Sequence, residues 1–441
     1  MKQSKHNIYY SPKEVRTILE RSIDTALDGL KCYCNDPVSD FTRCRKLPAR
    51  SLIECIMSFS NYSSIGELSH FFVGQGEMPS ASALSQRRQL LDPDIFKRIN
   101  NLFVSAFDDH TTINGYHILA QDGSDVNIPF MDDKTKTEKH DAKSFCQYHV
   151  NALYDCLNKV FYDWSIDAAS KKREVNALIS ILKDRNYPQN SIFTADRGYE
   201  SYNLMAHFIE NDIKFVIRVK DIHTKSGLMT NIKTEEGAFD MRVNRTLTSL
   251  QTKEIKADKE KYIFVPSTSN FDFLDETRDL YDLSFRAVRF KISEDTYETV
   301  VTNLSEEEFK TDDFKELYHY RWNEETAFNK LKYTIGLVYF HARKRKLIQQ
   351  EINAAFLMYN VSEVIIRNIY LKKNKKPELE YDYKPNFSSA VTNIRLYLRK
   401  KINMRELILR IKKFLVAQRP ERSYERNIKG QSCKPLNYRT S

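Results

Sequence analysis

Glycine and proline are scarce in this chain, with 11 and 12 residues respectively among 441. This scarcity excludes long Gly/Ser-rich or Pro-rich linkers, and a chain of this length is expected to fold into two to four compact domains. The seven cysteines form no C-x-x-C pair and have no histidines at zinc-finger spacing. Reduced, buried thiols are therefore expected in place of a disulfide framework or structural zinc.

A long uninterrupted apolar run is also missing. The first residues, "MKQSKHNIYYSPKE", are polar, and the most apolar window, "INAAFLMYNVSEVIIRNIYL", contains Asn353, Glu363 and Arg367. These polar side chains within that window indicate a buried helix and not a membrane span. We therefore expect a soluble, cytoplasmic protein without a membrane partner.

Acidic residues are sparse at one end of the chain. Residues 343–441 contain 24 Lys and Arg against 8 Asp and Glu, a net charge of +16, whereas the preceding 342 residues sum to −6. A basic segment on a mildly acidic body predicts a polyanionic partner, most simply nucleic acid. A basic tail that only keeps the chain soluble is the alternative, and charge alone does not decide between them.

Helical patterns dominate the first 110 residues. The stretch "SPKE" at 11–14 has the form of a capping box, with Ser11 as the N-cap and Glu14 bonding back to it. Further on, "SASALSQRRQLL" places Arg87 and Arg88 on a short helix after a turn, where they are candidates for DNA contact. Short arginine-bearing helices are also common elsewhere, so this alternative stays open.

The pattern changes after residue 116. Three strand-like runs, "YHILAQD", "QYHVNALYD" and "KVFYDWSIDA", precede an alternation of helix and strand that ends with "KFVIRVK". This order predicts an α/β fold with a mixed sheet covered by helices. Between about 221 and 296 the alternation gives way to β-rich pieces, and long basic helices follow residue 345.

Two aspartates are predicted at strand ends, because Asp122 closes "YHILAQD" and Asp196 closes "SIFTAD". Polar groups at the carboxyl ends of strands line the usual site of an open α/β sheet, and Glu325 on a later helix is a third candidate. Converging carboxylates repel one another, and hard oxygen ligands favour Mg²⁺ or Mn²⁺. Each residue alone also fits an ordinary turn or surface position, and Asp125 competes with Asp122. His149 is expected to be a sheet histidine and not a catalytic group.

The stretch "YHYRWNEETAFNKLKY", residues 318–333, predicts a single helix. At about 100° per residue, four polar side chains fall within roughly 60° of one another on the helical wheel. They are Tyr318, Arg321, Glu325 and Lys332, and they lie beside the apolar positions that are expected to face a core. A phenol, a guanidinium, a carboxylate and an ammonium thus share the border of the buried face.

This row, together with the earlier "QDGS" and "ADRGY", resembles the DDE transposases of bacterial insertion sequences. It is similar in particular to the cut-and-paste family with the Y-R-E-K signature, the insertion-sequence family numbered four. The resemblance covers about 116–345 and implies an RNase H-like mixed-sheet core interrupted by a β-rich insertion. The implied parts are a helical N-terminal DNA-binding domain at 1–110, a catalytic core at 111–220 and 297–345, a β-rich insertion domain at 221–296, and a basic helical C-terminal domain at 346–441.

The resemblance also implies roles for the signature residues. Asp122, Asp196 and Glu325 are implied to bind Mg²⁺, for which Mn²⁺ can substitute, and so to catalyse phosphodiester chemistry. The phosphates at the element end are implied to be held by the other members of the row, Tyr318, Arg321 and Lys332.

Relatives in this family form a DNA hairpin and stack a flipped base on a tryptophan of the insertion. The only tryptophans here are Trp164 and Trp322, which lie elsewhere, and Tyr297 is the aromatic nearest to the expected place. Tyr297 is therefore a candidate for base stacking, with an inward-packing strand tyrosine as the alternative. Arg197 and Tyr199 follow the second aspartate as in relatives, and we expect them to orient the loop or contact DNA.

The resemblance thus predicts a DNA transposase that binds the terminal inverted repeats of its element, cleaves the ends and transfers them to a target. Two ends must be brought together, so a homodimer in the synaptic complex is expected, on double-stranded DNA in the bacterial cytoplasm and nucleoid. Two alternatives are a non-cutting DNA-binding protein of transposase descent and an RNase H-fold nuclease. The intact acidic set argues against the first, and the Y-R-E-K row and the insertion argue against the second.

Overall fold

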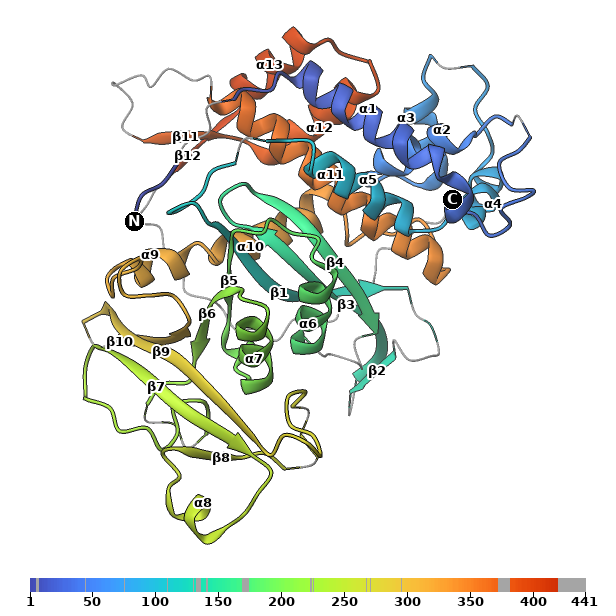
Figure 1. Cartoon of the computed structure of the whole chain (residues 1–441). Coiled ribbons are helices and arrows are strands. Elements are labelled where there is room, and N and C mark those ends of the chain that lie inside the picture. The colour runs from blue at the N-terminus through green and yellow to red at the C-terminus, as the bar shows by residue number, and fades with distance from the viewer. Residues whose placement is uncertain are drawn as a thin grey trace.

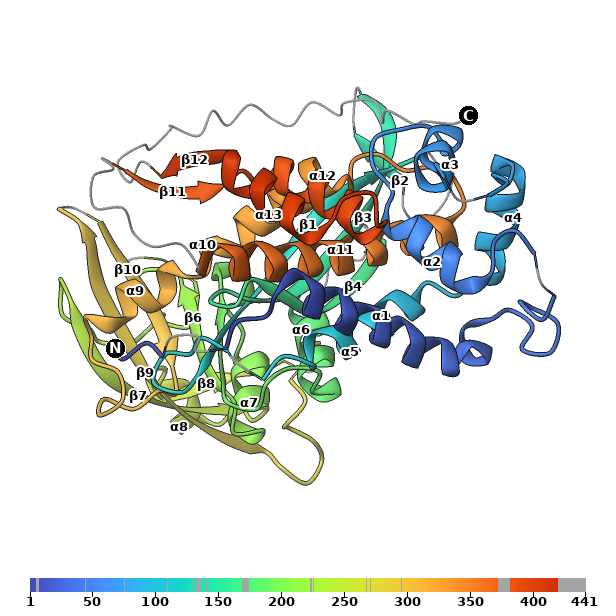
Figure 2. The same cartoon turned by 90° about the horizontal axis from the view of Figure 1, so that it is seen from above.

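A helical layer built from both ends of the chain lies on a large mixed sheet, and the far end of this sheet extends away from the helices (Figure 1). Figure 2 shows the same arrangement from above, with α1 beside the long α11. The computed structural model describes residues 1–4, 8–43, 45–74, 76–108, 110–129, 131, 136–139, 142–168, 174–222, 224, 226–266, 268, 269, 271–294, 296–371 and 381–418.

The expected mixed sheet is present, with ten strands in the described part of the chain. Its first part has the order β4-β3-β1-β5-β6, in which β1 is antiparallel to β3 and parallel to β5. Ile118 and Ala120 of β1 face one hydrophobic cluster and Leu119 faces the other, so both sheet faces are covered. The strands are β1 (His117–Ile128), β2 (Lys136–Lys139) at the edge, β3 (Ala142–Asp155), β4 (Val160–Ala168), β5 (Ser191–Ala195) and β6 (Lys214–Val219).

The β-rich segment predicted at 221–296 does not form a sheet of its own. Strand β10 (Thr296–Thr302) pairs antiparallel with β6, and the order continues β10-β9-β7-β8 away from the core. Val300 and Val301 of β10 pack into the clusters on opposite faces, so this strand belongs to the core sheet. The other elements of the segment are β7 (Phe239–Thr248), α8 (Lys253–Ala257), β8 (Tyr262–Phe264) and β9 (Leu280–Ser293).

The first 110 residues contain five α-helices in their described part. The capping box predicted at the start of α1 is confirmed, because Glu14 N–H donates to Ser11 Oγ (3.3 Å) and Ser11 N–H donates to Glu14 Oε2 (2.7 Å). The helices are α1 (Pro12–Asp28), α2 (Ala49–Met57), α3 (Ser64–Phe72), α4 (Ala81–Leu90) and α5 (Asp94–Val104), with a 3-10 turn, η1 (Leu30–Tyr33). They share one hydrophobic cluster with the carboxy-terminal helices and the nearer face of the sheet.

The most apolar window of the sequence lies in α11 (Arg345–Leu371), which packs between the amino-terminal helices and the sheet. Its polar side chains bond the sheet: Asn353 Oδ1 accepts from Trp164 Nε1 (2.7 Å), and Asn360 Oδ1 accepts from Phe161 N–H (2.8 Å). Across the described part of the chain, no helix is both long enough and apolar enough to cross a membrane. The chain continues through β11 (Asp382–Pro385), α12 (Phe387–Leu398), α13 (Met404–Lys413) and β12 (Leu415–Gln418).

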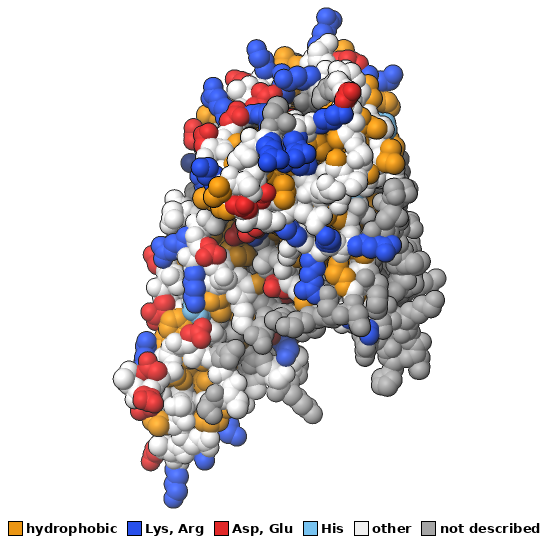
Figure 3. Space-filling model, turned by 90° about the vertical axis from the view of Figure 1, so that its right-hand side faces the viewer, with side chains coloured by type: hydrophobic (Ala, Val, Ile, Leu, Met, Phe, Trp, Pro, Cys, Tyr) orange, Lys and Arg blue, Asp and Glu red, His pale blue; other side chains and the backbone are white. Residues whose placement is uncertain are grey.

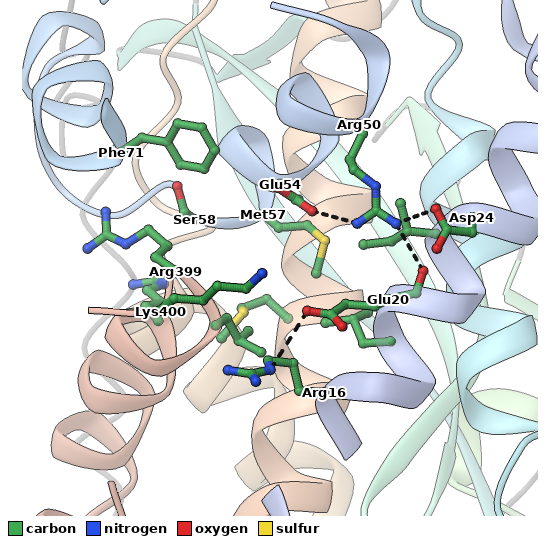
Figure 4. Close-up of a pocket in the computed structure, with 15 residues that line it drawn as sticks. Arg16, Glu20, Asp24, Arg50, Glu54, Met57, Ser58, Phe71, Arg399 and Lys400 are labelled. Carbon is green, nitrogen blue, oxygen red and sulfur yellow. Dashed lines mark hydrogen bonds and ion pairs between the residues drawn. The ribbon is translucent and has the colours of Figure 1, made fainter. Parts of the chain in front are cut away.

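A cavity of about 400 Å³ opens in the helical layer among α1, α2, α3, α11 and α12 (Figure 4). Two ion-pair groups line it: Arg50 contacts both Asp24 and Glu54, and Arg16 Nε lies 3.7 Å from Glu20 Oε1. Asp122, Asp196 and Glu325 are not among the residues that line this cavity.

Candidate active site

Asp122 and Asp196 lie at the point where two parallel strands part. The parallel pairing of β1 with β5 ends at Gln121 and Ala195, and the two aspartates are the next residues of the two segments. Neighbouring strands are about 4.8 Å apart, so the aspartates lie side by side. The prediction that Asp122 closes its strand is wrong, because β1 continues to Ile128 by pairing with β3.

The stretch 318–333 is not one regular α-helix, which corrects the sequence prediction. It consists of α9 (Asp313–His319), α10 (Trp322–Lys330) and a π-helical turn, η4 (Leu331–Ile335). Between α9 and α10 the hydrogen bonds tighten to i→i−3, as when Arg321 N–H donates to Tyr318 O (3.1 Å). The backbone stays in the right-handed helical region at Arg321, so α9 and α10 remain nearly continuous.

Arg321 brings the carboxylates of two distant elements together. Its Nη1 lies 3.8 Å from Asp122 Oδ2 of β1, and its Nη2 lies 3.3 Å from Glu325 Oε1 of α10. Arg321 is only 4% exposed. Asp196 also acts electrostatically on both Asp122 and Arg321. Arg321 therefore lies between Asp122 and Glu325, with Asp196 close enough to influence both Asp122 and Arg321 electrostatically.

Burial and mutual repulsion shift the protonation of this group. Desolvation raises the pKa of Asp122 to about 6, with Asp196 and Glu325 adding to the shift, while the Gly123 N–H and Arg321 oppose it. The Gly123 N–H donates to Asp122 Oδ1 at 2.8 Å. The Asp122 carboxylate is thus less stable as an anion than it would be in water, and added positive charge would stabilise it.

The donor chemistry of this group fits a divalent cation, since Asp122, Asp196 and Glu325 offer hard carboxylate oxygens. In the described residues, however, no three acidic, His or Cys side chains meet closely enough to form a ligand set. Arg321 lies between Asp122 and Glu325 and supplies positive charge there. The residues fit the ion by ligand type and by the raised pKa of Asp122, and their gathering into a ligand set requires a rearrangement of these side chains.

Tyr318 and Lys332, the outer members of the row, border the same group. Tyr318 is 2% exposed, and its hydroxyl has no hydrogen-bond partner among the described residues. Lys332 lies on the π-helical turn, where burial lowers its pKa and the nearby Asp125 and Asp122 oppose that shift. Both side chains are therefore near the carboxylates, and Tyr318 retains an unused polar group.

Other residues predicted to contact DNA differ in their exposure. Arg197 is exposed in the 3-10 turn η3 (Arg197–Tyr199), directly after Asp196. Tyr199 is 0% exposed in the core, so its predicted contact with DNA does not fit this structure. Tyr297 is half-buried on β10, with the Arg289 guanidinium 4.2 Å from its ring centroid, and its role in base stacking stays a prediction.

Of the two arginines of α4, Arg88 is buried and does not fit the predicted DNA contact, whereas for Arg87 that contact stays a prediction. Arg88 is 2% exposed and donates to Leu347 O (2.7 Å) and Glu351 Oε1 (2.7 Å) of α11. Arg87 is half-buried, donates to Leu47 O (3.1 Å) and stacks over Phe41. Only a tertiary partner more than 250 positions away distinguishes Arg88 from a surface arginine.

Sequence reasoning missed two acidic residues beside the group. Glu324 is fully buried, and burial together with Asp122 raises its pKa well above the usual value. Glu174, the first residue of α6 (Glu174–Asp184), lies 3.0 Å from Nε2 of His149, which is a buried sheet histidine as predicted. The one available signal was Gly123 directly after Asp122, since a glycine inside a strand often marks a close approach of another group.

The fold and the site define an α/β protein with an acidic candidate active site beside a helix that carries a buried arginine. The chain belongs to the transposase DDE domain family, whose model matches residues 113–361, more than half of its length. Among solved structures the chain is similar to one titled the cryo-EM structure of a piggyBac transposase synaptic complex with hairpin DNA. The identity is 11%, the TM-score is 0.44, and the alignment covers 96% of this chain and 89% of the other. No curated protein matches the chain.

Proposed function

We propose that this protein is the DNA transposase of an insertion sequence of the Y-R-E-K group, and that it cleaves and transfers DNA ends with Asp122, Asp196 and Glu325. The observation that carries the proposal is the approach of Asp122 and Glu325 to Arg321, with Asp196 at the end of the neighbouring parallel strand, inside the matched family domain. The strand order β4-β3-β1-β5-β6, with β1 parallel to β5, supports assigning an RNase H-like core.

The residues of this chain would act mainly by binding and positioning. Asp122, Asp196 and Glu325 would hold Mg²⁺ or Mn²⁺, and the chemistry that a bound ion supplies is activation of a water or 3′-hydroxyl and stabilisation of the leaving oxygen. Arg321 holds Asp122 and Glu325 facing each other. Lys332 offers a point charge and Tyr318 a neutral hydroxyl to a DNA phosphate, so the strand would be held in line with the carboxylates.

The proposal includes double-stranded DNA as the partner and a homodimer in the synaptic complex, in the bacterial cytoplasm and nucleoid. On the face shown in Figure 3, Lys and Arg side chains are interspersed with Asp and Glu over the described residues and do not form one basic field. DNA contact is therefore assigned to the surroundings of the acidic group, where Arg197 is exposed and Lys332 is partly exposed.

The test uses purified full-length protein, Mg²⁺ and a supercoiled plasmid that carries a matched pair of element ends. We expect excision and insertion with the wild type, a hairpin end on a denaturing gel, and at least a thousandfold loss in Asp122→Asn, Asp196→Asn and Glu325→Gln. Asp94→Asn, at an exposed position on α5, is the matched control and should retain activity.

Each other outcome supports a different conclusion. Specific binding to the element ends without nicking would indicate a non-cutting DNA-binding protein, and scattered nicks without joined products would indicate a nuclease. Full activity in Asp122→Asn would refute the assignment of the site.

A further inference from the structure

His149 lies between two carboxylates from different elements. It is 2% exposed on β3, with Nδ1 2.8 Å from Asp125 Oδ1 and Nε2 3.0 Å from Glu174 Oε1. Asp125 is the residue directly opposite His149 in the antiparallel pairing of β1 with β3, whereas Glu174 comes from the start of α6. These three side chains, Asp125, His149 and Glu174, therefore form a link between β1, β3 and α6.

The link crosses the backbone directly after Asp122. A methyl group on Gly123 would overlap the His149 imidazole and would lie 2.9 Å from Glu174 Oε1. The missing side chain at Gly123 is what allows His149 to reach Glu174. The same Gly123 N–H donates to Asp122 Oδ1 (2.8 Å), so the imidazole lies against the peptide that orients the Asp122 carboxylate.

The second oxygen of Glu174 reaches the other aspartate segment. A methyl group on Gly198 would lie 3.5 Å from Glu174 Oε2 and 3.0 Å from Asp196 Oδ1. Gly198 N–H donates to Asp196 Oδ1 (2.8 Å), which caps the turn that follows the aspartate. Glu174 thus lies between the backbone that carries Asp122 and the turn that carries Asp196.

The charges of this link are complementary. Burial alone would lower the pKa of His149, but the flanking Asp125 and Glu174 outweigh burial and raise it to about 9. At neutral pH the link is therefore an imidazolium between two carboxylates. Because each charge is partly removed from water, loss of any one of the three groups would leave another without its counter-charge.

We propose that His149, clamped by Asp125 and Glu174, is a positioning residue that holds the Asp122 and Asp196 segments together for the binding of a divalent cation. This inference rests on the proposed function, since it concerns the same acidic site. His149 does not itself touch the reacting atoms; it acts through Gly123 and through Glu174 beside Gly198. Residues that orient metal ligands typically change metal affinity tenfold to a hundredfold when they are replaced.

The test measures the dissociation constant of Mn²⁺ by calorimetry on the full-length protein without DNA, together with the melting temperature. We expect His149→Gln and Glu174→Gln to weaken Mn²⁺ binding by about tenfold to a hundredfold. Glu174→Gln is the milder variant, because the Glu174 side chain is 31% exposed and keeps its shape. The matched control is His207→Gln. His207 lies on α7 (Tyr202–Glu210) and forms a comparable pair, with its Nε2 2.7 Å from Asp272 Oδ2.

The outcomes separate the inference from the function on which it rests. If His149→Gln and Glu174→Gln lower the melting temperature as His207→Gln does but bind Mn²⁺ like the wild type, the histidine is merely structural and the inference fails. If the wild type binds no Mn²⁺, or Asp122→Asn binds it equally well, the proposed function fails instead. Weaker binding in both test variants, with unchanged binding in the control, supports the inference.

Discussion

Arg88 provides the most direct test of the distinction between a DNA-contacting arginine and a structural one. Its side chain donates to Gln350 Oε1 (3.2 Å), Leu347 O (2.7 Å) and Glu351 Oε1 (2.7 Å), all on α11. Replacement by methionine fills a similar volume but leaves the Glu351 carboxylate buried, with His341 as its remaining charged partner (3.1 Å).

Removing one partner of a buried ion pair costs about 3–5 kcal/mol, because the other charge stays out of water. Since His341 remains beside Glu351, we expect Arg88→Met to lower the free energy of unfolding by about 3 kcal/mol. Burial tends to raise the pKa of Glu351, but Arg88 and His341 reverse this and lower it. A carboxylate with a lowered pKa stabilises the folded state above its unfolded pKa, so the destabilisation should be largest near pH 7 and should shrink as the pH falls below about 4.5.

The assay is urea denaturation followed by far-UV circular dichroism at pH 7 and pH 3, with DNA affinity measured in parallel on the folded protein at pH 7. Arg87→Met is the matched control on the same helix, because Arg87 makes one hydrogen bond and one ring contact, and should lose about 1 kcal/mol. The double variant Arg88→Met with Glu351→Gln should lose less than the sum of its parts. A stability change below about 0.5 kcal/mol, combined with weaker DNA binding, would refute the structural role.

Three further predictions concern the acidic site. Because the pKa of Asp122 is raised to about 6, Mn²⁺ affinity should fall by up to about tenfold per pH unit below pH 6, and calorimetry with equal affinity at pH 5 and pH 7.5 would contradict this. The metal-free protein should instead become more stable as the pH falls from about 6 to 3.8, the usual pKa of an aspartate, because Asp122 is then protonated more readily in the folded state. Gly123→Ala should weaken Mn²⁺ binding as much as His149→Gln does, because the new methyl group displaces the imidazole, while Gly29→Ala, where a methyl group has room, should leave binding unchanged. Tyr199→Phe should keep DNA affinity and change stability by no more than about 1 kcal/mol, and a marked loss of affinity in filter binding would restore Tyr199 as a DNA contact.

The sequence was informative about the types of elements and the candidate acidic residues, because these depend on local pattern. Alternation of strand and helix predicted the mixed sheet, and the strand-like run before Asp122 placed this residue on the correct strand. The continuation of β1 past Asp122 was not predictable, because it depends on pairing with β3 and includes Gly123, a residue that disfavours strands. The roles of Asp122, Asp196 and Glu325 remain predictions.

The other differences are of two kinds, local changes in helix geometry and long-range pairing. The 3-10 hydrogen bonds at Arg321 and the π turn at Lys332 have no sequence signal in "YHYRWNEETAFNKLKY", which reads as an unbroken helix. The buried setting of Arg88 depends on α11, and the joining of the β-rich segment to the core depends on β10 pairing with β6. Such contacts join residues tens to hundreds of positions apart, which local propensity does not report.

Because β10 pairs with β6, the position of the site does not depend on the length of the segment before β10. The chain returns to the core sheet at β10 before it enters α9 and α10, the second of which carries Glu325, whereas α8 leads into β8, the outermost strand of the sheet. Residues around α8 are exposed at the far tip of the molecule (Figure 1). Evolution, or a protein engineer, could therefore graft an extra module at this tip without resetting the distance between Glu325 and Asp122.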